Sequence, residues 1–314
     1  MMGRAAIFKS LAIVLLWHLC AEYVAAATVT DDMGNVVSLA RPAQRIVSLA
    51  PHTTEMLFSI GAGELVVGAV QFSDYPDEAR HIPRVGNALN IDLERILAMR
   101  PDLVVAWQSG NSEDAVTTLR TLGVPIYLSE PRRLNQIGGN ILDLGVLTGK
   151  EDNAHRLATQ FAERLAVLQA TYGTRHPVRV FYQIWQQPLM TINGQHLISQ
   201  VLTLCGGINI FADLPVLAPR VDLESVLARK VEAILISSSA VDDTQAIQSW
   251  SKWQSLAAVR ERHIYNIPWD LISRHSLRIV EGAGLICEAL DQAREQAGYS
   301  KSVPPGMVPG QRGK

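Results

Sequence analysis

The chain has 314 residues, of which 48% are apolar and 18% are charged, and its formal net charge is -2. This length and composition are typical of a well-packed globular protein with two domains, and they argue against a disordered chain or a coiled coil. The weak net charge favours neither nucleic acid nor an anionic membrane as a partner, so any partner must be recognised by local contacts.

The first 27 residues have the pattern of a secretory signal peptide. Two basic residues precede an apolar run from Leu11 to Trp17, and Ala25-Ala26-Ala27 supplies small residues for cleavage. The run is shorter than the roughly 20 apolar residues that span a bilayer, which argues against a membrane anchor. The residues before Cys20 are too large for a lipoprotein cleavage site. We therefore expect export across the inner membrane by a signal peptide.

The cysteine count fits an oxidising compartment. If Cys20 leaves with the signal peptide, Cys205 and Cys287 are the cysteines of the mature chain. An even pair favours a disulfide, which would close a loop of roughly 80 residues and stabilise the second half by about 4 kcal/mol. The alternative is two buried free thiols, because cysteine is a common core residue.

The first half of the chain alternates strands and helices. Residues 45–50 predict a buried strand, Pro51 and His52 a loop, and Thr53 begins a helical pattern that stops at Gly61. The same alternation continues, with strands predicted at 65–70, 103–107 and 125–128 and helices at 93–99 and 115–122. This order predicts a parallel sheet covered by helices on both faces.

A long amphipathic helix is predicted over 151–172, where apolar residues recur at steps of three and four. Its 22 residues would span roughly 33 Å. A second α/β series follows, with a strand at 179–184 and a helix at 196–204. The predicted organisation is a signal peptide (1–27), an N-terminal lobe (28–148), a single backbone helix (149–173), a C-terminal lobe (174–298) and a disordered tail (299–314).

An internal repeat supports the division into two lobes. The segment Asp92-Leu93-Glu94-Arg95-Ile96-Leu97-Ala98 recurs, 130 residues later, as Asp222-Leu223-Glu224-Ser225-Val226-Leu227-Ala228, and an apolar strand pattern follows each copy. In each copy an aspartate can cap the N terminus of a helix whose apolar residues face the core. The sequence therefore predicts two lobes with the same plan.

Motifs of common enzymes are missing from the sequence. It has no Walker-type phosphate loop, no strand-linked Gly-x-Gly-x-x-Gly and no Gly-x-Ser-x-Gly elbow. The histidines of the mature chain are scattered without the close pairing of a zinc site, so we expect structural roles and no metal site. His52 and His275 are the two that we place in loops near the cleft.

Large aromatic residues lie at predicted strand ends or in loops: Tyr75, Trp107, Trp185 and Trp269. In α/β lobes, ligands bind outside the carboxyl ends of the strands. These side chains would suit a bulky, partly apolar ligand with a polar rim. For any one of them, packing in the core is the alternative.

Over residues 45–290 the sequence resembles the periplasmic solute-binding proteins of the helical-backbone class and, within it, the cobalamin-binding proteins that serve ABC importers. The segments that carry the resemblance are Ser48-Leu49-Ala50-Pro51 with Thr54-Glu55, Ser73-Asp74-Tyr75-Pro76, Asp92-Leu93-Glu94-Arg95-Ile96, Pro101-Asp102-Leu103-Val104 to Ala106-Trp107, Cys205-Gly206-Gly207 with Asn209-Ile210-Phe211, and Cys287.

The resemblance implies two Rossmann-like lobes on one rigid helix, with a corrinoid such as cobalamin or cobinamide held between them and little hinge closure. It implies a monomer without enzymatic activity, cofactor or nucleic-acid partner, which delivers its ligand to an inner-membrane ABC permease and its ATPase. Glu94 and Glu224 match carboxylates that dock onto permease arginines, and Cys205 and Cys287 match a family disulfide. The residues that we expect to contact the ligand are Pro51, His52, Tyr75, Trp107, Trp185, Asp270 and Arg274.

The sequence also departs from the family pattern. Ala88 and Ala218 stand where cobalamin binders of this type can carry tryptophans, and Trp185 stands where a small residue is usual. Either the aromatic wall has moved or the ligand differs. The alternative ligands are haem, which would need an axial ligand such as His52 or Tyr75, and a ferric siderophore; the lack of a basic cluster argues mildly against a highly anionic siderophore. An exported enzyme that uses the same cleft is the alternative from another class.

Overall fold

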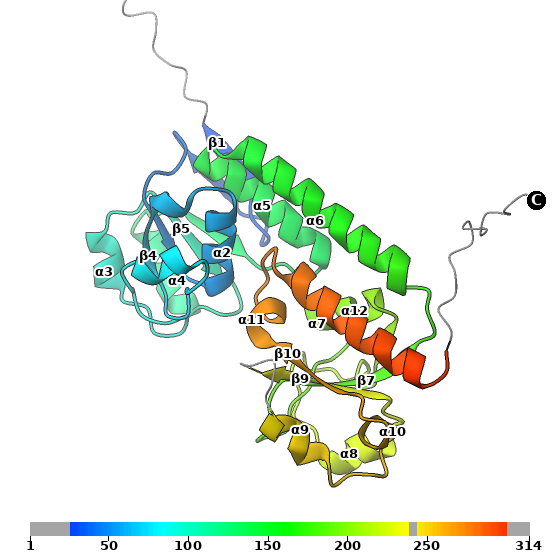
Figure 1. Cartoon of the computed structure of the whole chain (residues 1–314). Helices are drawn as coiled ribbons and strands as arrows, with labels where there is room; N and C mark the ends of the chain where they lie inside the picture. The colour runs from blue at the N-terminus through cyan, green and yellow to red at the C-terminus, as the bar shows by residue number, and fades with distance from the viewer. Residues whose placement is uncertain (1–25, 239–243, 300–314) are drawn as a thin grey trace, which may run out of the picture.

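The computed structural model describes residues 26–238 and 244–299 and consists of two α/β lobes joined along one side by long helices (Figure 1). The predicted signal peptide up to residue 25 and the predicted tail after Tyr299 lie outside these ranges. Each lobe contains a parallel sheet of four strands, so the predicted fold class is confirmed. Within the described ranges, no helix has the combined length and hydropathy that crossing a membrane requires.

The sheet of the N-terminal lobe lies between two layers of helices. Its strands are, in spatial order, β4 (Val66–Ala69), β3 (Ile46–Ser48), β5 (Leu103–Trp107) and β6 (Ile126–Ser129). Almost every strand residue is buried, as expected when helices cover both faces. One face packs against α2 (Pro51–Ser59) and α5 (Leu134–Thr148), and the other against α3 (Leu93–Ala98) and α4 (Glu113–Thr121).

The C-terminal lobe repeats this plan. Its strands are, in spatial order, β8 (Gly207–Asn209), β7 (Val178–Gln183), β9 (Ala233–Ser238) and β10 (Ile264–Pro268). One face packs against α7 (Leu197–Leu204) and α12 (Ile279–Gln296), and the other against α8 (Leu223–Ala228), α9 (Thr244–Trp250) and α10 (Ala257–Arg260). In both lobes the strand order is second, first, third, fourth along the chain.

The sequence repeat is also a structural repeat. The Asp92 carboxylate accepts a hydrogen bond from the backbone N–H of Arg95 at 3.0 Å and caps α3. The Asp222 carboxylate accepts one from the N–H of Ser225 at 2.6 Å and caps α8. Each helix has six residues and leads into the third strand of its sheet. The predicted helix starts are therefore confirmed in both lobes.

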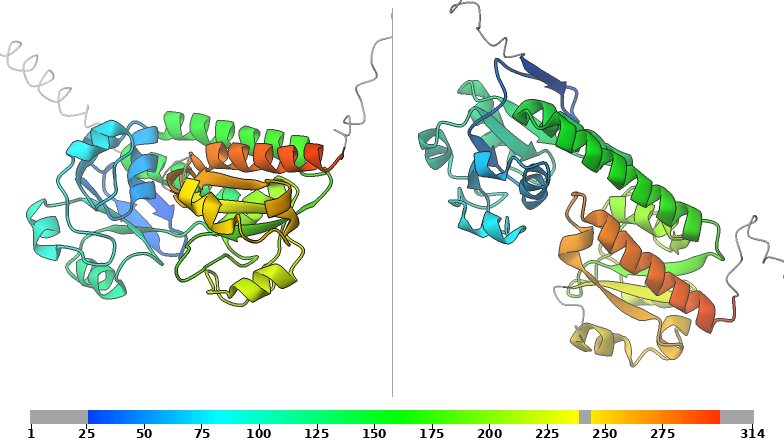
Figure 2. Two further views of the ribbon diagram at one scale, coloured as in Figure 1. Left: turned by 60° about the horizontal axis from the view of Figure 1, so that its bottom comes forward. Right: turned by 45° about the horizontal axis from the view of Figure 1, so that its top comes forward.

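The predicted backbone helix is accompanied by a second helix, α5, whose first residues reach the core of the C-terminal lobe. The predicted backbone helix is α6 (Glu151–Tyr172), and α5 runs beside it and contributes Leu134 and Ile137 to the core of the C-terminal lobe. A side chain at Gly145 of α5 would place its Cβ 2.4 Å from the Cβ of Ala154, so the close approach of α5 to α6 requires glycine. Figure 2 shows α12 running alongside α6 on the same side of the molecule.

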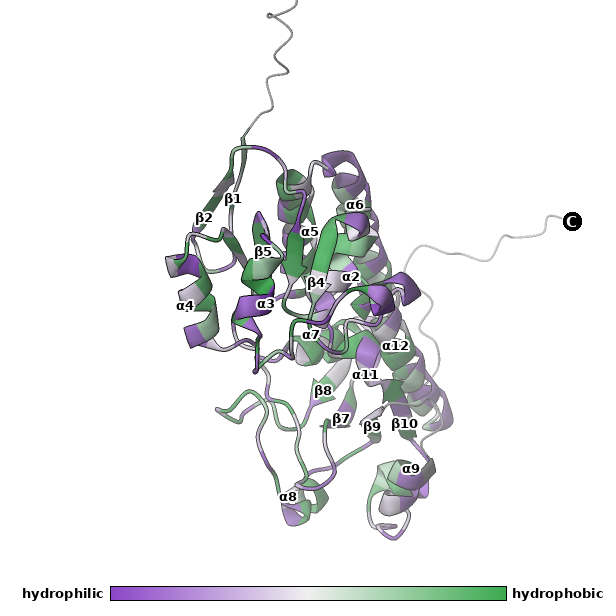
Figure 3. Cartoon of the chain, turned by 90° about the vertical axis from the view of Figure 1, so that its left-hand side faces the viewer, coloured by the Kyte–Doolittle hydropathy of each residue, from purple (hydrophilic) through white to green (hydrophobic). Residues whose placement is uncertain are grey.

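The hydropathy of each residue follows these layers. In Figure 3 the strands β4 and β5 are largely green, whereas polar purple residues mark much of α6 and α4. α6 buries Ala154 and Phe161 and leaves most of its other side chains accessible. One apolar stripe is therefore enough to hold this helix against both lobes.

Three features differ from the local predictions. Pro51 and His52 are not a loop but the first turn of α2, because proline lacks an N–H that the first turn does not use. The segment before residue 45 forms an antiparallel hairpin of β1 (Ala27–Thr30) and β2 (Val36–Leu39). No helix is predicted over α5 or α12, which are helices of 15 and 18 residues.

The predicted disulfide is present. It joins Cys205, at the C-cap of α7, to Cys287 in α12 across 82 residues. Both cysteines are fully buried in the core of the C-terminal lobe. The bond therefore ties together the two helices that cover one face of the sheet.

Candidate ligand cleft between the lobes

The carboxyl ends of both sheets meet at the boundary between the lobes. α2 follows β3 in the N-terminal lobe, and α11 (Trp269–Ile272) follows β10 in the C-terminal lobe. Residues of these segments touch, because Arg274 donates to the Glu55 carboxylate at 2.7 Å. Ligand sites of α/β sheets lie at such strand ends. The interlobe boundary is therefore the place to look for a binding site.

A network of ion pairs crosses this boundary. Glu55, only 2% exposed on α2, accepts hydrogen bonds from Arg274 at 2.7 Å, from Arg278 at 3.2 Å and from the Ser276 hydroxyl. Two further carboxylates complete it: Asp74 pairs with Arg274 at 2.7 Å, and Asp270 pairs with Arg278 at 2.8 Å. We call these six residues the interlobe ion-pair network: Glu55, Asp74, Asp270, Arg274, Ser276 and Arg278.

Next to this network, three rings from both lobes pack together. The ring centroids of His52 and Trp107 are 5.4 Å apart, and His275 of the C-terminal lobe lies 5.8 Å from His52 and 6.1 Å from Trp107. Burial lowers the pKa of His275 to about 4, and burial together with His275 and Arg274 holds the pKa of His52 well below its usual value. Both imidazoles are therefore neutral at pH 7.

Residues in the turn after β5 hold Trp107, the last residue of that strand, in place. The Asn111 side chain accepts a hydrogen bond from the Trp107 backbone N–H at 2.7 Å and donates to the carbonyls of Leu49 and Ala88. Gly110 leaves room for the indole, because a Cβ there would lie 1.9 Å from the ring. Within the described part of the chain, the buried indole N–H of Trp107 has no hydrogen-bond partner. It is a donor that a ligand or a water molecule could use.

Tyr75 presents an aromatic face in the N-terminal lobe. It lies after β4 and is 44% exposed. The Arg278 guanidinium sits 3.8 Å from the centroid of its ring, a cation–π contact between the lobes. This contact orients the ring from one side. An exposed, oriented aromatic ring suits the apolar surface of a ligand.

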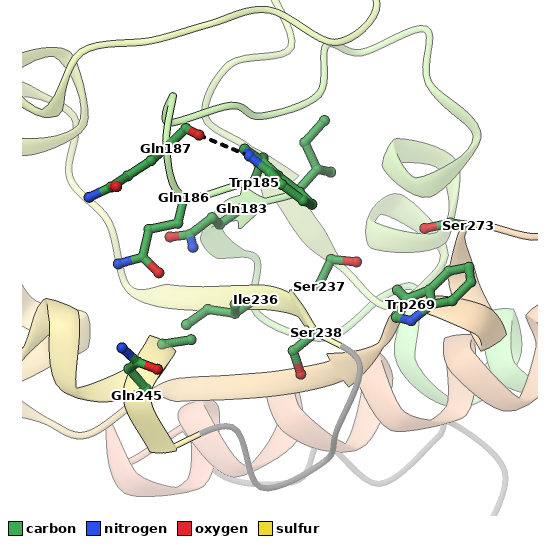
Figure 4. A pocket seen from close by; sticks show the side chains of 12 residues that line it. Gln183, Trp185, Gln186, Gln187, Ile236, Ser237, Ser238, Gln245, Trp269 and Ser273 are labelled. Carbon is green, nitrogen blue, oxygen red and sulfur yellow. Dashed lines mark hydrogen bonds between the residues drawn. The ribbon is translucent and has the colours of Figure 1, made fainter.

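A cavity of about 820 Å³ opens at the carboxyl ends of β7, β9 and β10 in the C-terminal lobe (Figure 4). Its lining includes Trp185 and Trp269, with Ser237 and Ser238 at the end of β9. The Trp185 indole donates to the Gln187 carbonyl at 2.9 Å, which fixes the loop after β7. The volume is within the roughly 300–1,000 Å³ of small-molecule sites.

The structure brings some of the predicted ligand residues together at the interlobe boundary and places others in the cavity of the C-terminal lobe. Pro51 starts α2 beside His52, which is almost completely buried against Trp107. The resemblance matches Asp270 and Arg274 to a polar pair that contacts the ligand, but Arg274, only 5% exposed, pairs with Glu55 and Asp74, whereas Asp270 pairs with Arg278. Trp185 is exposed and lines the C-terminal cavity, together with residues of its own lobe.

The two predicted docking carboxylates, Glu94 and Glu224, are exposed. Each is the second residue of a short helix, α3 or α8, and these helices belong to different lobes (Figure 1). Neither residue belongs to the interlobe network or to the lining of the cavity. The structure therefore separates them from the cleft residues.

The sequence reasoning missed the two residues that connect the network, Glu55 and Arg278, and the glutamines of the cavity. A signal for the arginines was present, since Asp270, Arg274 and Arg278 recur at steps of four. Gln186 and Gln187 directly follow the predicted Trp185. No local signal marks Glu55, because its partners are more than 200 residues away.

Comparison with known proteins agrees with this architecture. A family model described as "Periplasmic binding protein" matches residues 46–271. The vitamin B12-binding protein of Vibrio cholerae serotype O1 (strain ATCC 39541) is 36% identical over 256 residues, which cover 81% of this chain and 92% of the relative.

Solved structures show the same likeness. The crystal structure of the periplasmic vitamin B12 binding protein BtuF of Vibrio cholerae has a TM-score of 0.75 and 36% identity, covering 81% of this chain and 99% of that one. The periplasmic heme-binding protein RhuT from Roseiflexus sp. RS-1 shares the fold, with a TM-score of 0.72, 22% identity and coverage of 80% and 99%. By family model, sequence and structure, this chain belongs to the periplasmic binding protein family.

Proposed function

We propose that this protein captures cobalamin or a related corrinoid in the cleft between its lobes and delivers it to an inner-membrane ABC importer. The observation that carries the proposal is the 36% identity to a vitamin B12-binding protein across both lobes, with the same fold. The protein would act in the periplasm as a monomer, without chemistry or cofactor of its own, after export by its signal peptide.

The cleft supports a large ligand that is partly apolar. Tyr75 offers an exposed ring from the N-terminal lobe, and Trp185 and Trp269 line the cavity of the C-terminal lobe. A corrin ring would contact these aromatic side chains and the uncharged polar groups between them. Asp270 and Arg278, an ion pair at the boundary, would contact its rim.

The proposal is tested by ligand binding to the purified mature protein. We expect calorimetry to show one binding event with cyanocobalamin or dicyanocobinamide, and no shift of the Soret band on mixing with haem. His52 is too deeply buried to serve as an axial ligand, so Tyr75 is the candidate if haem binds. A Soret shift with haem, together with no heat from either corrinoid, would overturn the proposal.

We further propose that Glu94 and Glu224 dock onto arginines of the permease and that the permease works with its ATPase. The support is their exposure at equivalent places in the two matched lobes. Glu94→Gln and Glu224→Gln should leave corrinoid affinity unchanged and weaken binding to the permease in nanodiscs. Glu113→Gln, an exposed helix-start glutamate outside the repeat, is the matched control. Loss of corrinoid binding in either docking variant would show that the assignment is wrong.

A further inference from the structure

The cavity of the C-terminal lobe is lined by uncharged polar side chains. Among the residues that the structure describes, its lining includes four glutamines, three serines and two tryptophans, and no charged side chain. Figure 4 shows Gln186 and Gln245 on one side of the cavity and Trp269 and Ser273 on the other. The glutamines come from the end of β7, from the loop after it and from α9. Separate segments thus bring amide groups together.

The charged groups of the adjacent boundary are already paired. Arg274 binds Glu55 and Asp74, and Arg278 binds Glu55 and Asp270. Three carboxylates therefore face two guanidinium groups. His52 and His275, the imidazoles at this boundary, are neutral because burial lowers their pKa. The cleft has no uncommitted positive charge in these groups to compensate an anionic ligand.

The amide groups suit a ligand of matching chemistry. A glutamine side chain offers two N–H donors and a carbonyl acceptor, the same set as a primary amide of a ligand. A pair of such groups can donate and accept in both directions. A carboxylate has only acceptors, and it would lose its hydration without gaining a cation. The lining therefore discriminates between an amide and an acid of the same shape.

Part of the lining is already oriented without a ligand. Gln183 accepts a hydrogen bond from the Trp250 indole at 2.9 Å through its side-chain oxygen, which fixes the plane of its amide. The loop after β7 is closed by the hydrogen bond from Trp185 to Gln187 and by the one from the Ile184 N–H to Met190 at 3.0 Å. Preorganised groups lose less entropy on binding, so these contacts favour selectivity.

We propose that this cavity is a carboxamide-recognition site, in which Gln183, Gln186 and Gln245 select corrinoids with primary-amide side chains over those with free carboxylates. The inference rests on the proposed function, because it names the ligand chemistry of the same cleft. Trp185 and Trp269 would contact the apolar edge of the corrin between the amide groups.

The test compares dicyanocobinamide with dicyanocobyrinic acid, in which the peripheral amides are carboxylates. Calorimetry at pH 7.5 should give an affinity for the acid that is about 100-fold lower, because the acid offers no donor to the glutamine carbonyl groups and loses its hydration without gaining a cation. The difference should stay above about tenfold in 0.5 M NaCl, where long-range repulsion is screened. Equal affinities, or a difference that vanishes in salt, would overturn the inference and leave the proposed function standing.

Variants separate the cavity from the overall charge. Gln186→Lys with Gln245→Lys should raise the affinity for the acid about tenfold relative to cobinamide, since each adds a local counter-charge. Gln248→Lys, also on α9 but outside the lining, adds the same kind of charge elsewhere and should change little. All three positions are exposed, so the variants should fold, which circular dichroism can verify. If Gln248→Lys raises the relative affinity for the acid as much as the double variant does, the cavity does not select amides. If the wild type binds neither corrinoid, the proposed function itself is wrong.

Discussion

Replacing Glu55 with glutamine tests whether the interlobe ion-pair network holds the two lobes together. The Glu55 carboxylate is buried on α2, and its three partners, Arg274, Ser276 and Arg278, all belong to the C-terminal lobe. Glutamine keeps the volume and one carbonyl acceptor, but it removes the charge shared by the two guanidinium groups. The change therefore acts on the electrostatics of the boundary and little on its packing.

The structure sets the size of the expected effect. Removing one partner of a buried ion pair costs about 3–5 kcal/mol, because it leaves an uncompensated charge. Arg274 and Arg278 each keep a second carboxylate, Asp74 or Asp270, whose side chains are 44% and 35% exposed. We therefore expect the lower end, a loss of about 3 kcal/mol in the free energy of unfolding.

Differential scanning calorimetry and urea unfolding at pH 7.5 measure this loss. The midpoint should fall by roughly 6 to 12 °C in Glu55→Gln. Asp74→Asn is the matched control, because it breaks an ion pair with the same Arg274 from an exposed position and should cost less than about 1 kcal/mol. If Glu55→Gln costs no more than Asp74→Asn, the network does not stabilise the contact between the lobes.

Three further predictions concern the ligand, the disulfide and pH. Tyr75→Ala should lower corrinoid affinity about tenfold by calorimetry, whereas Tyr299→Ala, equally 44% exposed but distant from the cleft, should not; equal effects would exclude a specific role of Tyr75. The double variant Cys205→Ala, Cys287→Ala should lose about 4 kcal/mol in guanidinium unfolding, since a closed loop of 82 residues is released, and an unchanged midpoint would contradict this. Burial lowers the pKa of His275 to about 4, and burial together with the nearby His275 lowers the pKa of His196 to about 4. Between pH 6.5 and 4 the unfolded chain therefore binds more protons than the folded chain. The histidine contribution to the free energy of unfolding should therefore be complete above about pH 6.5 and fall as the pH drops, by about 1.4 kcal/mol per pH unit for each histidine. The melting temperature of His275→Gln should fall less steeply with pH than that of the wild type. Identical slopes would show that His275 is not a source of the pH dependence.

Local sequence patterns were sufficient for most of the fold. Apolar runs and periodicity are properties of neighbouring residues, so they located strands β3 to β7 and β9 and the limits of α6, and the aspartates at positions 92 and 222 marked helix starts in both lobes. The patterns failed where the local signal is weak or ambiguous. α5 is buried over much of its surface and contains three glycines, so it lacks a clear polar face, and Pro51 fits a helix start as well as a loop.

The sequence by itself thus determined two matched α/β lobes, their strand ends and the aromatic residues placed there, because each depends on short-range order along the chain. The tertiary structure alone decided which charges meet. Glu55 pairs with Arg274 and Arg278 at separations of 219 and 223 residues, and packing of the lobes buries Glu55 and Arg274 and leaves Arg278 half-buried. The same packing pairs both arginines of the interlobe ion-pair network with carboxylates, and it places amide groups from three segments around one cavity. Ion pairing and cavity lining depend on distances in space, which no local pattern encodes.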